Sequence, residues 1–309
     1  MCESKLAPII VFCYNRQFHL EQLIESLKNN SLAESSSLFI FSDGYKNEDD
    51  RDAVLEVRRY LKTITGFWEI YIEERSSNMG LGNNVIEGVS YVFGKFDKII
   101  VLEDDLLVSS DFLDFMNRAL DFYTSDPRIY SISGFNFKFK LSENYKEEVY
   151  LLPRICSLGW GTWRNRWNSV NWDMEYFPSF IEDVRQRQRF QIGGENLTLI
   201  LLKQYLGYYK SWAIRWDYNR FLNNAYCLYP ANPKVINKGN DGSGTNDSVF
   251  IKQNTRLSNI RVRLKENIEV NEELVNAASR VFRLSIIKKI YFKYLLLKYY
   301  LRKYSIVKF

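Results

Sequence analysis

Residues 98–105 read Lys98-Ile-Ile-Val-Leu-Glu103-Asp104-Asp105, an apolar run that leads directly into three consecutive carboxylates. Three neighbouring anions raise one another's pKa unless a cation or hydrogen-bond donors compensate for their charge. In open α/β sheets, ligands bind outside the carboxyl ends of the strands, which is where this triplet would lie. The stretch therefore predicts a site for a positively charged ligand at one edge of a sheet.

Outward from this stretch, the first 130 residues alternate between strand-like and helix-like patterns. Apolar runs predict four buried strands, at residues 8–14, 38–42, 69–74 and 98–102. Helical periodicity predicts helices between and after them, at residues 17–29, 48–61, 83–93 and from 110 onward. Such alternation is typical of βαβ units and predicts a Rossmann-like α/β fold with a mostly parallel central sheet.

The second half of the chain is less regular. It shows strand-like runs at 128–135 and 149–152, broken helical patterns over 178–224, and a segment rich in Pro, Gly and Asn at 229–247. No apolar run reaches 18 residues, so the sequence predicts no membrane-spanning helix.

Charge separates a basic tail from a mildly acidic body. Nine of the 42 basic residues and none of the 37 acidic ones lie between Arg280 and Phe309, so the rest of the chain, with 33 basic residues, has a net charge of about −4. This distribution argues against a nucleic-acid-binding fold. The tail places apolar residues on one helical stripe, at Ile286, Ile290, Tyr294, Leu297, Leu301 and Tyr304. It suits an amphipathic helix on an anionic membrane surface, or a helix docked on the body or on a second subunit.

The content of histidine and cysteine limits the chemistry. His19 is the one histidine, which argues against a His-based zinc site or a His-centred triad. The four cysteines form no close pair, and together with the lack of a secretory signal this indicates a reducing, cytoplasmic setting. Catalysis would then depend on carboxylates, amides, basic side chains and a hard metal ion.

Other polar residues are expected at the same edge of the sheet as the triplet. Arg16 follows the first predicted strand, and Asp43 follows the second. An arginine there suits a phosphate group, and an aspartate suits a ring N–H or a ribose hydroxyl, although each residue could equally serve a turn or a helix cap. The Gly/Asn loop 78–84 opens a helix and resembles a phosphate cradle, without the spacing of a P-loop or a dinucleotide fingerprint.

The carboxylate triplet suits Mn²⁺ or Mg²⁺, which proteins hold through one or two carboxylates while water and substrate phosphates complete the coordination. An acidic cluster at a helix N-terminus is the alternative. A nucleotide-binding α/β half with such a triplet resembles the GT-A glycosyltransferases, more closely the inverting N-acetylglucosaminyltransferase I-like and family 2-like nucleotide-sugar transferases. Leu106 and the helix start at Asp111-Phe112 continue the likeness, which covers roughly residues 7 to 250.

The resemblance implies roles for the residues at this edge. Asp105 would hold the metal, and Glu103 and Asp104 would support the metal and the ribose. Arg16 would meet the donor diphosphate, Asp43 would read the uracil of a UDP-sugar, and Asn78 would belong to the donor loop. The Pro- and Gly-containing segment 229–244 resembles the part of the family that closes over the donor.

The resemblance also points to a catalytic base. Trp216-Asp217 is similar to the family segment whose aspartate deprotonates the acceptor, although Tyr218 stands where the family has a second aspartate. Asp173, Glu175 and Glu195 are the substitutes for Asp217. The tryptophan-rich stretch from Leu158 to Trp167 is similar to the family's Leu-Gly-Trp loop, and its rings either stack on sugars or serve ordinary packing.

The resemblance thus implies an inverting, metal-assisted hexosyl- or N-acetylhexosaminyltransferase that acts on a saccharide or lipid-linked glycan in polysaccharide biosynthesis. We expect a donor-binding half at 1–130, an acceptor-binding and catalytic half at 131–255, and a basic helical tail at 256–309 that holds the protein at the inner face of the plasma membrane. A homo-oligomer is also compatible with this sequence. The rival hypotheses are a nucleotidyltransferase that makes nucleotide-sugars and a non-catalytic glycan- or membrane-binding protein.

Overall fold

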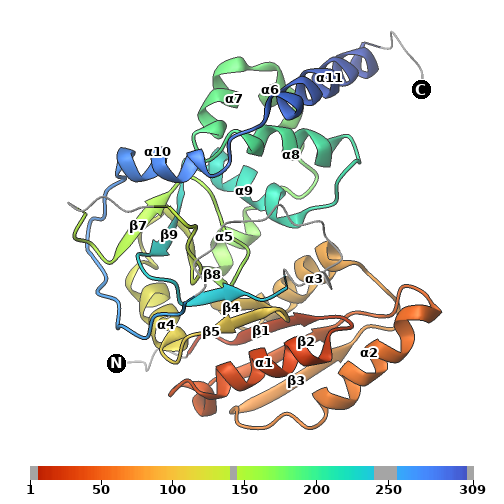
Figure 1. The fold of residues 1–309 in the computed structure, drawn as a ribbon, viewed down its shortest axis with the longest axis vertical. Coiled ribbons are helices and arrows are strands. Elements are labelled where there is room, and N and C mark those ends of the chain that lie inside the picture. The colour runs from red at the N-terminus through yellow and green to blue at the C-terminus, as the bar shows by residue number, and fades with distance from the viewer. Residues whose placement is uncertain (1–5, 140–144, 240–255, 305–309) are drawn as a thin grey trace.

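A computed structural model describes residues 6–139, 145–239 and 256–304, and it has a central sheet of eight strands flanked by helices (Figure 1). The strand order is β3-β2-β1-β4-β8-β6-β9-β7. The first four strands of that order are β3 (Glu69–Glu74), β2 (Ser37–Ser42), β1 (Ile9–Cys13) and β4 (Lys98–Glu103). The other four are β8 (Trp160–Trp163), β6 (Ile129–Ser133), β9 (Tyr226–Pro230) and β7 (Val149–Leu152).

The N-terminal half of the sheet is parallel, as the alternation of patterns predicts. β1 pairs in parallel with β2 and β4, and β2 pairs in parallel with β3. Continuous burial of β1 explains its uninterrupted apolar run, because strands covered on both faces lack polar alternation. The helices that connect and cover these strands are α1 (Gln17–Lys28), the 3₁₀ turn η1 (Ala33–Ser35), α2 (Glu48–Leu61), α3 (Leu81–Phe93) and α4 (Phe112–Phe122).

The C-terminal half of the sheet is mixed. β8 lies between β4 and β6 and runs antiparallel to both, β6 and β9 are parallel, and β7 is antiparallel to β9. The sequence does not predict β8, because its residues lie in the stretch that resembles the Leu-Gly-Trp loop of the family. A separate ribbon pairs β5 (Leu106–Val108) with β10 (Val235–Asn237) directly after the carboxylate triplet.

The remaining helices are α5 (Arg164–Asn168), α6 (Phe177–Glu182), α7 (Val184–Gln191), α8 (Asn196–Tyr205), α9 (Trp212–Leu222), α10 (Glu272–Arg280) and α11 (Ile286–Lys303). All of them except α5, which lies beside β8, gather at the end of the molecule away from β1–β3, in the upper part of Figure 1. α11 packs on α8, α8 packs on α9, and α9 packs on α3 (Figure 1). The helical layer therefore reaches from the C-terminal tail to the nucleotide-binding half predicted from the sequence.

Two apolar cores hold these parts together. The larger core spans the sheet from β1 to β9 and includes residues of α10, and the smaller one joins α6–α9 to α11 through Leu295 and Tyr299. The expected mostly parallel α/β fold with a C-terminal helix is confirmed, whereas the division at residues 130 and 255 stays a prediction. Within the described ranges, no helix is both long enough and apolar enough to cross a membrane.

Candidate active site

Three neighbouring parallel strands end side by side and bring the predicted residues to one edge of the sheet. The β1 residue Phe12 is in register with Glu103, and Cys13 is in register with Ser42. The backbone N–H of Asp104 donates to the carbonyl of Phe12 at 3.1 Å, which continues the ladder into the triplet. The strand order alone thus places the residues after β1, β2 and β4 at a common edge, where ligands bind in α/β sheets.

The guanidinium of Arg16 lies between two carboxylates of the triplet. Its Nη2 forms an ion pair with Oδ1 of Asp104, and it lies 3.1 Å from Oδ2 of Asp105. The backbone N–H of Tyr14 donates to the other oxygen of Asp104 at 3.3 Å. Arg16 therefore supplies part of the positive charge that the triplet requires.

The triplet is not fully neutralised by this arginine. Burial raises the pKa of Glu103 to about 8, and the charges of Asp105 and Asp104 add to that effect. Burial also raises the pKa of Asp104 to about 6, although the Arg16 guanidinium acts in the opposite direction. A further cation at this edge would lower the electrostatic cost of three adjacent anions.

Asp105 has the free ligand atom that such a cation needs. Its Oδ1 is buried and has no hydrogen-bond partner among the described residues. A buried carboxylate oxygen without a partner is costly, and metal coordination is one way to satisfy it. A single carboxylate oxygen suits an ion such as Mn²⁺ or Mg²⁺ that takes its other ligands from water and phosphates. In the described ranges no cluster of three or more His, Cys, Asp or Glu side chains could hold a metal.

The chain after β10 covers Asp105. The backbone N–H of Lys238 donates to the carbonyl of Asp105 at 2.8 Å. A Cβ atom on Gly239 would overlap the Asp105 carboxylate, coming within 2.9 Å of its Cγ and 3.0 Å of Arg16 Nη1. Nothing in the local sequence marks Gly239, because only the pairing of β10 with β5 brings residues 134 positions apart together.

Asp43 organises the loop that precedes α3. Its Oδ1 accepts from the backbone N–H groups of Gly44 at 2.9 Å and Met79 at 2.8 Å. Its Oδ2 accepts from Gly80 N–H at 3.0 Å and from the side-chain amide of Asn78 at 3.3 Å. Asp43 and Asn78 are therefore brought together, as expected for one donor-side loop. With four donors already present, a uracil N–H would have to share or displace one of them, and the base-reading role stays a prediction.

Asp217 lies in α9 and is only 2% exposed. Its Oδ1 accepts from Nε of Arg220 at 2.6 Å and from the backbone N–H of Ile155 at 3.2 Å. A base must reach the acceptor hydroxyl, and this geometry instead gives Asp217 a buried ion pair. The assignment of Asp217 as the base stays a prediction.

The three possible substitutes for Asp217 lie elsewhere. Glu195 forms an ion pair with Lys289 of α11 at 3.1 Å. Asp173 and Glu175 are exposed in the segment before α6, where Glu175 accepts from Asn171 at 3.0 Å. None of these contacts connects a substitute to the carboxylate triplet.

The geometry of this edge can be compared with known proteins. A family model described as glycosyl transferase family 2 matches residues 9–185, which include Arg16, Asp43 and the whole triplet. The chain belongs to glycosyl transferase family 2. This membership confirms the resemblance drawn from the sequence and the expected GT-A type of α/β fold.

Among curated proteins, this family 2 chain is 22% identical over 194 residues to an Arabidopsis thaliana α-1,3-mannosyl-glycoprotein 2-β-N-acetylglucosaminyltransferase. The match covers 58% of the chain and 43% of that relative, so the chain matches less than half of the relative's length.

Solved structures that resemble this family 2 protein share little sequence with it. A Pyrobaculum calidifontis mannosyltransferase, PcManGT, in complex with GDP-Man and Mn²⁺ has a TM-score of 0.37 at 14% identity, covering 52% of this chain and 45% of that one. S. aureus TarS has a TM-score of 0.42 at 8% identity, covering 74% and 36%. GalNAc-T7 with UDP, GalNAc and Mn²⁺ has a TM-score of 0.43 at 12% identity, covering 74% and 43%.

The tryptophan-rich stretch of this family 2 protein serves packing. Trp160, Trp167, Trp212 and Trp216 are each at most 4% exposed. Their rings contact one another, with the Trp160 and Trp216 centroids 4.3 Å apart. The hypothesis that Trp160 and Trp167 stack on sugars is therefore wrong, because both rings are buried against each other and against Trp216 of α9.

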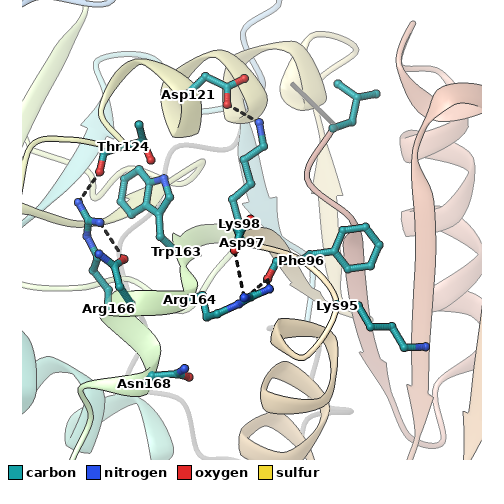
Figure 2. A pocket seen from close by; sticks show the side chains of 12 residues that line it. Lys95, Phe96, Asp97, Lys98, Asp121, Thr124, Trp163, Arg164, Arg166 and Asn168 are labelled. Atoms are coloured by element: carbon teal, nitrogen blue, oxygen red, sulfur yellow. Dashed lines mark hydrogen bonds and ion pairs between the residues drawn. The ribbon is translucent and has the colours of Figure 1, made fainter. Parts of the chain in front are cut away.

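A cavity of about 620 Å³ opens in this family 2 protein near the amino end of β4, at the end of that strand opposite to the carboxylate triplet (Figure 2). Lys98, at the start of β4, lines it and pairs with Asp121. Arg164 lies 3.2 Å from Asp97, and Arg166 donates to the Thr124 carbonyl at 2.8 Å (Figure 2). The cavity is thus lined by paired charges and lies a full strand length from the triplet.

Proposed function

We propose that this protein is an inverting glycosyltransferase that moves a hexosyl or N-acetylhexosaminyl group from a nucleotide-sugar, UDP-linked in our proposal, to a hydroxyl of a saccharide or lipid-linked glycan. The observation that carries this proposal is the buried Oδ1 of Asp105, which has no partner in the described part of the chain and lies beside Arg16 at the carboxyl edge of the sheet. A metal ligand and an arginine side by side suit the two phosphates of a nucleotide-sugar.

The residues at the carboxyl edge of the sheet would have different roles in donor binding. Asp105 would hold Mn²⁺ or Mg²⁺, with Glu103 and Asp104 supplying negative charge around it. When bound, the metal contributes positive charge that stabilises the departing diphosphate. Arg16 would turn from the carboxylates towards the diphosphate oxygens, and the Asp43-ordered loop at 78–80 would shape the donor pocket.

Inversion requires a base that takes the proton from the acceptor hydroxyl as that oxygen attacks the anomeric carbon. We propose Asp217 for this role, in which its carboxylate must first leave Arg220.

We further propose that α11 lies on an anionic membrane surface at the cytoplasmic face. The helix is docked on the body by Leu295 and Tyr299. Five residues of the stripe predicted from the sequence point away from the body and are 56–77% exposed, namely Ile286, Ile290, Tyr294, Leu297 and Tyr304. Basic side chains border this stripe, a combination that suits anionic lipid.

The decisive experiment is a panel of UDP- and GDP-sugars incubated with the protein and Mn²⁺, with release of the nucleoside diphosphate as the signal. Calorimetric titration of the same donors gives binding independently of turnover. Hydrolysis or transfer of at least one donor, lost on chelation, supports the proposal. Donor binding without any turnover, or no binding at all, contradicts it and favours a non-catalytic glycan-binding protein.

A further inference from the structure

The loop between α8 and α9 carries two adjacent exposed tyrosines, Tyr208 and Tyr209, which are 43% and 40% exposed. Gly207 starts this loop with a φ of 81°, a left-handed conformation that favours glycine and turns the chain out of α8. The N–H of Tyr208 donates to the Lys203 carbonyl at 2.9 Å. Both rings are thus presented from a short turn whose backbone is held to the preceding helix.

The far end of the loop is equally fixed. The N–H of Ser211 donates to the side-chain oxygen of Gln204 at 2.6 Å, and the Ser211 hydroxyl accepts from Ile214 N–H at 3.3 Å as the N-cap of α9. Such side-chain caps stabilise the start of a helix. The two rings therefore stand on a rigid base, which limits the conformational entropy lost when a ligand stacks on them.

The loop leads into a contact with the start of α3, on the donor side of the molecule. Burial raises the pKa of Tyr209, and the charge of Glu103 adds to that effect. The N–H of Trp212, which follows the loop, is 3.9 Å from the place where a Cβ on Gly82 would stand, at the start of α3. The same α3 begins directly after the 78–80 loop that Asp43 holds.

The loop also contacts the helix proposed to lie on the membrane. The Lys298 ammonium of α11 is 5.2 Å from the centre of the Tyr208 ring, and the Lys203 ammonium is 5.4 Å from that of Tyr209. Cation–π contacts of this kind attract each ring towards the helix that carries the lysine, α11 for Tyr208 and α8 for Tyr209. The loop consequently connects the predicted donor edge with α11.

We propose that the loop at residues 207–211 binds the acceptor saccharide, with the ring of Tyr209 as the surface on which an acceptor sugar stacks. The inference rests on the proposed glycosyl transfer and adds a residue that determines acceptor binding. Aromatic faces suit the C–H surfaces of sugars, and the tryptophans first considered for this task are buried. Tyr208, in contact with Lys298, lies where a glycan entering from the lipid surface would pass.

The test compares Tyr209→Ala with Tyr209→Phe, and with Tyr176→Ala as a control for loss of an exposed tyrosine, since Tyr176 is 59% exposed before α6. Hydrolysis of the donor by water is measured without acceptor. Transfer is measured with p-nitrophenyl glycosides of glucose, galactose, mannose and N-acetylglucosamine. Saturation-transfer NMR with these glycosides gives binding without any donor.

Tyr209→Ala is expected to raise the acceptor KM about tenfold and to abolish the NMR signal, while donor hydrolysis stays within about twofold of the parent protein. Tyr209→Phe keeps the ring and is expected to behave like the parent, as is Tyr176→Ala. Unchanged acceptor KM and NMR signal in Tyr209→Ala would overturn the proposal, and so would an equal fall in donor hydrolysis. Failure of the proposed function has a different signature: the parent protein hydrolyses no donor, although the NMR comparison still reports whether Tyr209 binds a glycoside.

Discussion

Gly239 lies against the carboxylate of Asp105 so closely that no side chain fits between them. The contact joins the strand β10 to the end of β4 and leaves Asp105 Oδ1 buried without a hydrogen-bond partner among the described residues. The geometry of the proposed metal site thus depends on a glycine distant in sequence.

Gly239→Ala is expected to displace Asp105 and Arg16 and to weaken Mn²⁺-dependent UDP binding at least about tenfold, measured by calorimetry, because the new Cβ overlaps the carboxylate. Gly82→Ala is the matched control. There the nearest atom to the new Cβ is 3.9 Å away, and the residue is in α3, where alanine favours the helix. If both variants bind UDP equally well, Gly239 has no role in shaping the proposed metal site.

Asp105→Ala is expected to lower transfer at least about 100-fold and to abolish Mn²⁺ binding, since the metal contributes several kcal/mol to stabilising the leaving diphosphate. The melting temperature should change little, because Oδ1 of Asp105 has no hydrogen-bond partner among the described residues and Arg16 keeps its ion pair with Asp104. Calorimetric titration with Mn²⁺ alone measures the loss directly. Full activity of this variant in the presence of a chelator would exclude the metal role.

Arg16→Gln is expected to strengthen binding of Mn²⁺ alone, because the guanidinium that partly neutralises Asp104 and Asp105 is gone. The same variant should bind UDP with Mn²⁺ more weakly, by about tenfold or more, if Arg16 meets the diphosphate. Titrating the variant with the metal first and then with UDP separates the two effects. A parallel change in both affinities would contradict a dual role for Arg16.

Asp217→Asn distinguishes a structural role from a catalytic one. If the Arg220 pair is the main role of Asp217, the variant leaves a buried arginine unpaired and loses about 3 kcal/mol of unfolding free energy. If Asp217 is the base, donor binding and melting temperature are preserved while transfer falls. Chemical denaturation and donor titration on the same sample decide between the two, and Asp217→Asn/Arg220→Gln tests whether removing both charges restores stability.

Ile290→Glu/Leu297→Glu is expected to abolish flotation with vesicles containing anionic phosphatidylglycerol, because both side chains lie on the exposed stripe of α11. Val184→Glu/Ile192→Glu is a control of equal charge on exposed residues around α7. Substitution is preferable to deleting the tail, since deletion would uncover the apolar surface that Leu295 and Tyr299 bury. Flotation by both variants, or by neither, would reject this surface as the membrane contact.

Much of the N-terminal half could be predicted from local pattern. The run before Glu103 forms β4, and the apolar stripe of α1 is buried as its periodicity indicates. Both predictions succeed because burial of consecutive or helically spaced residues leaves its mark within a few positions of the chain. The sequence also predicts the apolar stripe of α11. Only the structure shows that this stripe is exposed, because it shows that α11 docks on the body through Leu295 and Tyr299 instead.

The second half shows where local pattern is insufficient. Trp160 appeared to belong to a loop, yet it forms β8 between two strands far from it in sequence. Asp217 matched a family segment, yet its helix turns it towards Arg220. The pairing of β8 is not encoded nearby, because it depends on which distant strands meet during folding. Asp217 and Arg220 are only three positions apart in one helix, but the burial of their ion pair depends on the distant segments that pack around α9.

The sequence by itself determined that a parallel α/β half would end β4 in three carboxylates, and that Arg16 and Asp43 would lie at the same edge, since strand direction and short-range periodicity are local properties. Only the tertiary structure decided that Arg16 pairs with both Asp104 and Asp105, that Gly239 covers Asp105, and that Tyr209 stands exposed whereas Trp160 is buried. These contacts arise from packing between segments more than 80 residues apart, where close fit and charge compensation select among the surfaces that the local pattern leaves open.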